Sequence, residues 1–91
     1  MPADPAEHVF HQYVVTTSDR SALIHYLREN SIGFDIHYPT PVHRQPCYAD
    51  TLGLIPHPVA ERLADSILSL PITRTTSLDD AHAIAAILSR F

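Results

Sequence analysis

The chain has 91 residues, of which 45% are hydrophobic and 18% are charged. This length suits one domain, because a single hydrophobic core serves chains of up to about 150 residues. Six arginines against ten acids give a formal net charge of −4, which argues against nucleic acid and anionic membrane surfaces as partners. The one cysteine, Cys47, excludes an intramolecular disulfide and suits a reducing compartment, so we expect a cytoplasmic protein.

The first seven residues contain two prolines, two acids and few side chains able to pack in a core. We therefore expect residues 1–7 to be a linker or a frayed N-terminus, and residues 8–91 to form the domain. The domain is predicted to open with a strand over residues 9–16, because β-branched and aromatic residues cluster there on both faces.

A helix is predicted next, from a cap at Ser18 to about Arg28. Its apolar residues recur at helical spacing and are Leu23, Ile24 and Leu27. A short strand is then expected at residues 33–37. Pro39 and Pro41 end that strand, because proline supplies no backbone donor to a sheet.

Residues 38–57 carry four prolines and form the longest irregular stretch, with one helical turn expected at residues 48–52. This loop concentrates groups that suit a polar ligand. Arg44 would bind phosphate, and Tyr38 or Tyr48 would stack on a flat ring or a sugar. The alternative, which residue types alone leave open, is a proline-rich surface turn whose histidines are merely solvated.

The remaining elements are two helices and a brief strand. Pro58 suits the first turn of a helix whose apolar stripe continues until just before Pro71. A third strand is expected at residues 70–73. The last helix is predicted to open at Ser77, where an acid three residues later completes a capping-box spacing, and to end at Phe91.

This order of elements predicts an α+β fold. We expect a small two-layer sandwich, in which helices cover one face of a short, mostly antiparallel sheet. The other face would then present apolar residues, with Val9 and Tyr13 among them. Such an open face suggests self-association or a protein partner.

Other chemistry has weak support. His37, His43 and Cys47 offer nitrogen and sulfur ligands, but their spacing matches no common zinc motif. Cys47 has no evident third group to activate it as a nucleophile. Glu61 and Asp65, near the start of the predicted helix, are expected to be ordinary charges on a solvated face.

Several runs of residues resemble the carboxyl-terminal quarter of the DegT/DnrJ/StrS family of sugar-nucleotide aminotransferases. The most specific is His-Tyr-Pro-x-Pro-x-His-x-Gln at residues 37–45. The run Ala-Glu-Arg at residues 60–62 and the run Leu-Ser-Leu-Pro at residues 68–71 add to the likeness. Ser31 departs from the family, which usually has a helix-ending glycine there. A serine in a left-handed cap costs about 1 kcal/mol relative to glycine.

The resemblance implies the small C-terminal domain of a fold-type I enzyme that uses pyridoxal phosphate (PLP). In a complete family member this domain closes the substrate side of a site built by a large cofactor-binding domain. The matching loop lies near the nucleotide-sugar and the cofactor in such enzymes. The resemblance therefore implies that His37, Tyr38 and His43 bind substrate, and it assigns no catalytic or cofactor-binding residue to this chain.

The chain contains no lysine, whereas family members need one to bind PLP covalently. We therefore expect no cofactor on the isolated chain and no transaminase activity from it. The expected partner is a large PLP-binding domain or an aminotransferase subunit. The alternative is a standalone binding or regulatory module that self-associates or docks onto an aminotransferase. An independent enzyme using Cys47 or a metal is a third, weaker hypothesis.

Overall fold

A computed structural model describes residues 4–91 of the chain. Part of the expected N-terminal linker, residues 1–3, lies outside the described residues. The described part of it holds one 3₁₀ turn, Pro5–Glu7, in which the Asp4 carboxylate accepts a hydrogen bond from the Ala6 amide at 2.9 Å. The regular elements in chain order are β1 (Tyr13–Thr16), α1 (Arg20–Glu29), α2 (Pro58–Ser66), β2 (Ile67–Leu70) and α3 (Leu78–Leu88).

The two strands form an antiparallel sheet, as expected, in which Tyr13 pairs with Leu70 and Thr16 with Ile67. The first strand is shorter than the predicted residues 9–16. The strand pairing stops at Tyr13, opposite Leu70.

The boundary between α2 and β2 corrects the sequence prediction. The helix ends at Ser66, and the strand occupies Ile67–Leu70 instead of residues 70–73. Pairing with β1 and burial of Leu68 outweigh the helical spacing of these apolar residues. The Arg20 guanidinium donates hydrogen bonds to the carbonyls of Ala64 and Ile67, and so satisfies acceptors at the end of α2.

Two further predictions about local structure are wrong in detail. The cap of α1 is Asp19 instead of Ser18, and its carboxylate accepts from the Ala22 amide at 2.9 Å. The expected strand at residues 33–37 is reduced to a single bridge. Asp35 exchanges both backbone hydrogen bonds with Ser69, at 3.1 and 2.8 Å.

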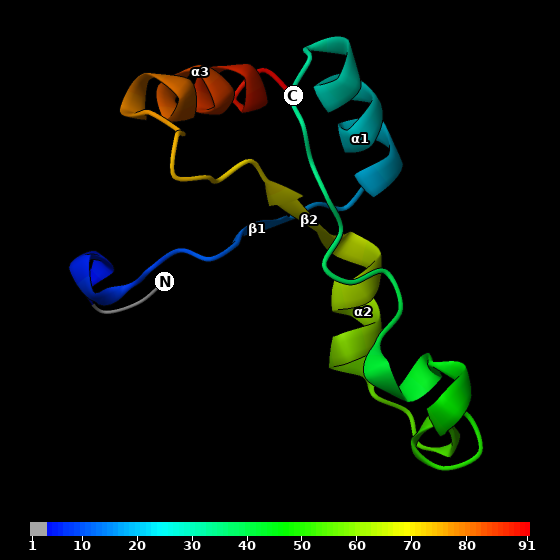
Figure 1. Ribbon diagram of the computed structural model, residues 1–91. Coiled ribbons are helices and arrows are strands. Elements are labelled where there is room, and N and C mark those ends of the chain that lie inside the picture. Colours follow the sequence, from blue (N-terminus) through cyan, green and yellow to red (C-terminus); the bar gives the residue numbers. More distant parts are fainter. Residues whose placement is uncertain (1–3) are drawn as a thin grey trace.

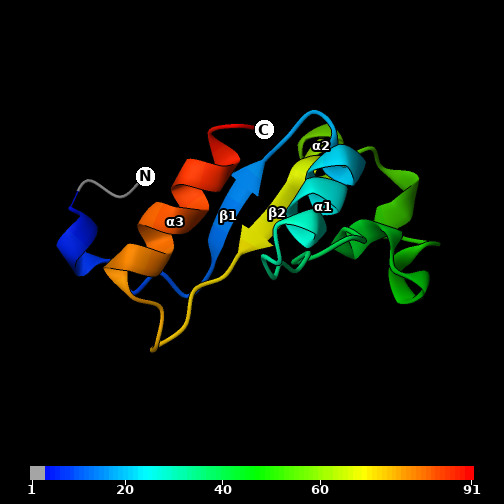
Figure 2. The same cartoon turned by 90° about the horizontal axis from the view of Figure 1, so that it is seen from above.

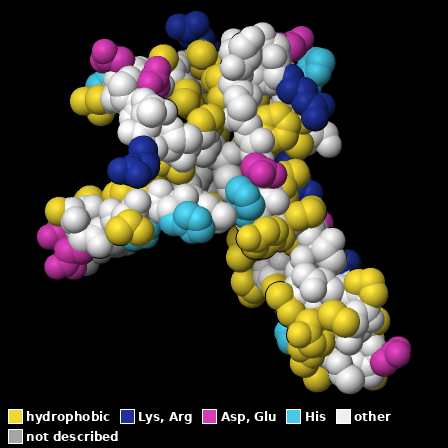
Figure 3. Space-filling model, in the orientation of Figure 1, with side chains coloured by type: hydrophobic (Ala, Val, Ile, Leu, Met, Phe, Trp, Pro, Cys, Tyr) yellow, Lys and Arg dark blue, Asp and Glu magenta, His cyan; other side chains and the backbone are white. Residues whose placement is uncertain are grey.

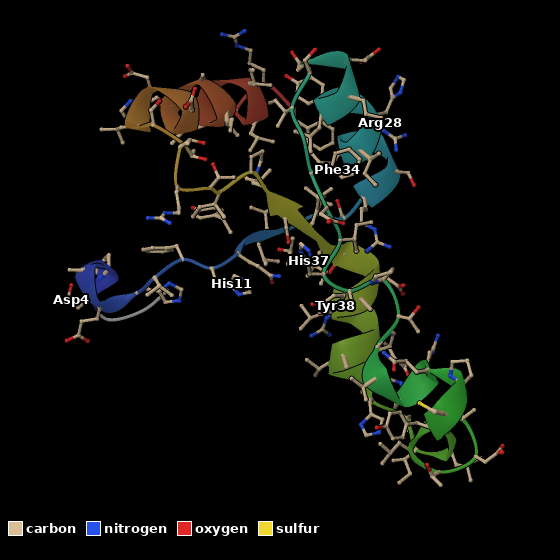
Figure 4. The ribbon with its side chains drawn as sticks, viewed as in Figure 1. Asp4, His11, Arg28, Phe34, His37 and Tyr38 are labelled. Atoms are coloured by element: carbon tan, nitrogen blue, oxygen red, sulfur yellow. The ribbon has the colours of Figure 1, made fainter. Side chains whose placement is uncertain are left out.

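The core lies between the sheet and two helices. Helices α1 and α3 lie over the same face of the sheet, which gives the expected two layers (Figure 2). The buried residues of this core are Leu23, Leu27, Ile32, Leu68 and Leu70. The Tyr26 hydroxyl joins the helices by donating to the Ile87 carbonyl at 2.8 Å. In the same layer the Arg28 guanidinium lies over the Phe34 ring (Figure 4).

Helix α2 and residues 38–57 extend away from the sheet as an arm (Figure 1). This arm contains three 3₁₀ turns, Val42–Arg44, Pro46–Tyr48 and Leu52–Leu54, where one helical turn was expected. The last helix begins with the predicted capping box and ends at Leu88, three residues before the predicted end. Among residues 4–91, no helix combines the length and the apolar character needed to cross a membrane.

Candidate functional site

The loop at residues 37–45 leaves the sheet beside β2 and crosses to α2. His37 lies at its start, and its Nδ1 atom is 2.9 Å from the Ser69 hydroxyl of β2. On the other side of the ring, Nε2 is 3.5 Å from the Asp35 carboxylate. His37 therefore turns both ring nitrogens toward groups of this chain.

Tyr38, the next residue, points outward from the loop, and 69% of its surface is exposed. Figure 4 shows His37 and Tyr38 side by side where the loop passes between β2 and α2. Their rings meet edge to face with centroids 5.4 Å apart. Two prolines follow, Pro39 and Pro41, and each fixes its own φ angle. The phenol of Tyr38 is therefore presented on a stiffened segment.

The far end of the loop is bound to α2 through Glu61. His43 is buried, and its Nε2 atom is 3.0 Å from one carboxylate oxygen of Glu61. The Nη2 atom of Arg44 is 3.2 Å from the other oxygen. A carboxylate only accepts hydrogen bonds, so His43 donates through Nε2.

Glu61 corrects the expectation of an ordinary solvated charge. Its side chain is 27% exposed and lies in the first turn of α2, where a negative charge is favourable. The hydrogen bond from His43 lowers the pKa of the Glu61 carboxyl, and partial burial opposes that change. The His57 amide and the Arg44 charge lower the pKa further. Glu61 is consequently ionised at neutral pH.

A shallow groove of about 450 Å³ runs between the loop and α2. Its lining is mostly apolar and includes Tyr38, Val42, His43, Leu52, His57 and Leu63. The rings of His43 and His57 are 4.5 Å apart there. Within the described part of the chain, the buried Nε2 atom of His57 has no hydrogen-bond partner.

The other candidate groups do not come together. Among residues 4–91, no three His, Cys, Asp or Glu side chains lie close enough to hold a metal ion. Cys47 is exposed on the second 3₁₀ turn of the arm. Arg44, suggested for phosphate binding, is already paired with Glu61, although its side chain stays 60% exposed.

Two residues that organise this loop, Glu61 and Ser69, are absent from the site predicted from sequence. Glu61 lies 18 positions from His43, so only the folded chain brings the two together. Ser69 carried a usable signal, because it is a lone hydroxyl between two leucines of a strand. A buried polar side chain of that kind needs a partner, and here the partner is His37.

Comparison with known proteins identifies the family. Residues 1–89 match the DegT/DnrJ/EryC1/StrS aminotransferase family. The chain belongs to this family. Membership confirms the resemblance read from the loop at residues 37–45 and the Leu-Ser-Leu-Pro run.

Two curated relatives show the range of the family. The chain is 44% identical over 85 residues to the erythromycin biosynthesis sensory transduction protein EryC1 of Saccharopolyspora erythraea, covering 91% of this chain and 23% of that protein. It is 32% identical over 88 residues to the dTDP-3-amino-3,6-dideoxy-α-D-galactopyranose transaminase of Aneurinibacillus thermoaerophilus, covering 97% and 24%.

A solved structure has the same fold. The crystal structure of S. venezuelae DesV in complex with a ketimine intermediate superposes with a TM-score of 0.75 at 33% identity. The match covers 88% of this chain and 22% of DesV. The chain thus spans about a quarter of the length of its curated relatives, and its α+β fold is that of part of such a protein.

Proposed function

We propose that this chain is the small-domain part of a PLP-dependent sugar-nucleotide aminotransferase, and that it closes the substrate side of a site supplied by a large domain. The main support is the match to DesV, which covers most of this chain but only 22% of that protein. Relatives named as transaminases of amino sugars carried on dTDP or UDP support this class of substrate. In a complete family member PLP supplies the amino-transfer chemistry.

The residues of this chain do not fit PLP by themselves. None of the 91 residues is a lysine, so the chain has no amine that binds the cofactor covalently. The loop guanidinium that would suit a phosphate, Arg44, is paired with Glu61. We therefore propose that the chain contributes substrate contacts and leaves cofactor binding to its partner.

A partner is also supported by the surface of the arm. Figure 3 shows hydrophobic side chains gathered along α2 and the 3₁₀ turns. The exposed ones, which we call the α2 patch, are Val42, Leu52, Leu54, Ile55, Val59 and Leu63. Clusters of this kind commonly mark surfaces that are buried in an assembly. We propose that the large domain covers the α2 patch.

On this proposal, the loop at residues 37–45 lies on the substrate side. Tyr38 is the most exposed of the three proposed substrate-binding residues, whereas His37 and His43 are held by groups of this chain. Tyr38 offers a ring for stacking and a hydroxyl for hydrogen bonding, both of which suit a sugar or a nucleobase.

The test is a chimera in which this chain replaces the matching segment of DesV. We expect the chimera to bind PLP, seen as a visible absorption band, and to transfer amino groups to a nucleotide-linked keto sugar. The isolated chain should show neither property, and DesV lacking the segment should not turn over. A chimera that binds PLP without any turnover would contradict the proposal. A stable self-associated form of the isolated chain that fails to dock would favour the standalone binding module.

A further inference from the structure

The segment between His37 and His43 is attached at both ends to different elements. At one end, the His37 ring lies 2.9 Å from the Ser69 hydroxyl of β2. At the other end, the His43 ring lies 3.0 Å from the Glu61 carboxylate of α2. The attachment points are separated by only five intervening residues, two of which are prolines. Little conformational freedom is therefore left in the segment.

The contacts with Glu61 depend on the orientation of the groups as well as on their charge. His43 and Arg44 are consecutive residues of one 3₁₀ turn, and each reaches a different oxygen of the same carboxylate. Two charge-assisted contacts to one planar group fix the orientation of the turn, not only its distance from α2. The His57 amide, at 3.5 Å, approaches the same carboxylate from the helix cap.

The three residues that the family resemblance names as substrate contacts, His37, Tyr38 and His43, differ in how exposed their side chains are. The side chain of His43 is 7% exposed and that of His37 is 27% exposed, and both rings contact protein groups. Tyr38 projects from the stiff segment between them. An exposed aromatic ring on a rigid backbone segment loses little conformational entropy on binding a ligand.

We propose that Glu61 and Ser69 are positioning residues, which act through His43 and His37 to hold residues 38–42 as a rigid bridge that presents Tyr38. The rigid bridge itself does not depend on the proposed function. The ligand of Tyr38 does, since we take it to be the nucleotide-sugar of the aminotransferase.

The bridge is tested on the 91-residue chain by amide hydrogen exchange at Arg44 and Gln45, whose N–H groups bond to Pro41 and Val42. Glu61→Ala should speed exchange there by about tenfold, because a hydrogen bond to a charged group is lost. Glu61→Gln keeps an acceptor without the charge and should have a smaller effect. The matched control is Asp65→Asn, which removes an exposed carboxylate from the same helix and should change nothing.

A role of Glu61 that did not depend on its negative charge would not give the expected pH profile. Within the described residues, the ionisable side chains in contact with Glu61 are His43 and Arg44, and the His57 ring lies 4.5 Å from the His43 ring. The excess exchange of Glu61→Gln over the unmodified chain should disappear as the pH falls through the lowered pKa of Glu61, because both chains then lack the charge. An excess that persists unchanged in acid would overturn the proposal.

Equal exchange in the Glu61→Ala and Asp65→Asn variants would also overturn it. If Glu61→Ala unfolds, seen as fast exchange in the β1–β2 pair, then Arg44→Gln replaces it as the deciding variant. That substitution removes one half of the contact from an exposed side chain, so it should speed exchange at the turn several-fold while the strands stay protected. Unchanged exchange in Arg44→Gln would overturn the bridge.

The proposed role of Tyr38 in binding the nucleotide-sugar is tested in the DesV chimera. Tyr38→Ala and Glu61→Gln should both raise KM for the nucleotide-sugar by about tenfold or less and change kcat little, as expected for lost substrate positioning. An unchanged KM in both variants would overturn the role of Tyr38. A chimera that is inactive with the unmodified chain contradicts the proposed function alone, because the exchange experiment still decides whether the bridge exists.

Discussion

At the scale of single residues, Ser31 shows how one backbone position ends a helix. The Ile32 amide donates to the Leu27 carbonyl at 2.9 Å and the Ser31 amide to the Arg28 carbonyl at 3.1 Å, which closes α1 in a Schellman motif. This motif needs a left-handed residue, and Ser31 supplies it with a φ of 56°. Ile32 and Leu27 then both lie in the core.

Ser31→Gly should therefore stabilise the chain. Glycine adopts positive φ without steric cost, and its greater freedom in the unfolded state cancels only part of that gain. We expect the free energy of unfolding to rise by up to about 1 kcal/mol in urea denaturation. The control is Ser89→Gly at the end of α3, where φ is −66° and glycine brings no such relief. A loss of stability in Ser31→Gly would contradict the assignment of strain.

The candidate site could be predicted from sequence only as far as its residue types. Residue types alone leave open whether residues 37–45 bind a ligand or form a solvated surface turn, and the family resemblance, which names His37, Tyr38 and His43 as substrate contacts, stays a prediction. Which rings face inward depends on Glu61 and Ser69, which are distant in the sequence. Periodicity carries no information about such pairs, so the two anchors appear only in the folded chain.

At the scale of elements, local chemistry was enough to predict the start of α3, whereas strand pairing decides where α2 ends. The start of α3 is a local matter, and its capping box forms as predicted between Ser77 and Asp80. The end of α2 is not. Residues 67–70 fit the apolar stripe of a helix, yet they pair with β1 and bury Leu68. The strand with which residues 67–70 pair, β1, lies some 50 residues earlier in the sequence, so the spacing of apolar residues within one segment cannot reveal this pairing.

The capping box makes a prediction of its own. The Ser77 hydroxyl accepts from the Asp80 amide at 3.0 Å and donates to the Asp80 carboxylate at 2.7 Å. Ser77→Ala should therefore lower the free energy of unfolding by about 1 kcal/mol at pH 7. Ser21→Ala, at an exposed position inside α1, is the control and should be neutral or slightly stabilising. Equal effects of the two substitutions would contradict a capping role.

The cost of Ser77→Ala should also depend on pH. The hydrogen bond from the Ser77 backbone amide makes the larger contribution to lowering the pKa of Asp80, and the hydrogen bond from the Ser77 hydroxyl lowers it further. A lowered pKa gives stability that is fully present above the ordinary aspartate value of about 3.9 and is lost as pH falls through the folded value. Part of the difference between Ser77→Ala and the unmodified chain should therefore vanish in acid. Urea midpoints measured between pH 7 and pH 2 check this trend.

At the scale of the whole molecule, the arm makes the chain extended. The radius of gyration is 15.7 Å, whereas a compact domain of this length has about 12 Å. The sequence predicted an open sheet face with Val9 and Tyr13. By strand alternation Tyr13 shares the helix-covered face with Val15, and Val9 precedes the strand. Exposed apolar side chains gather instead on the α2 patch, and four of its six residues lie in the loop at residues 38–57, where no periodicity marks them.

This shape predicts where a large domain binds. Val59 is 58% exposed on the α2 patch and outside the core, so Val59→Ser should leave the fold intact. We expect it to weaken binding of the separate chain to DesV lacking the matching segment by about tenfold, since a buried apolar side chain contributes about 1.5 kcal/mol or more. The control is Leu78→Ser, which removes a still more exposed side chain from the start of α3. Isothermal titration calorimetry measures both. A greater loss from Leu78→Ser would place the contact on α3, and the loop at residues 37–45 would then face away from the large domain.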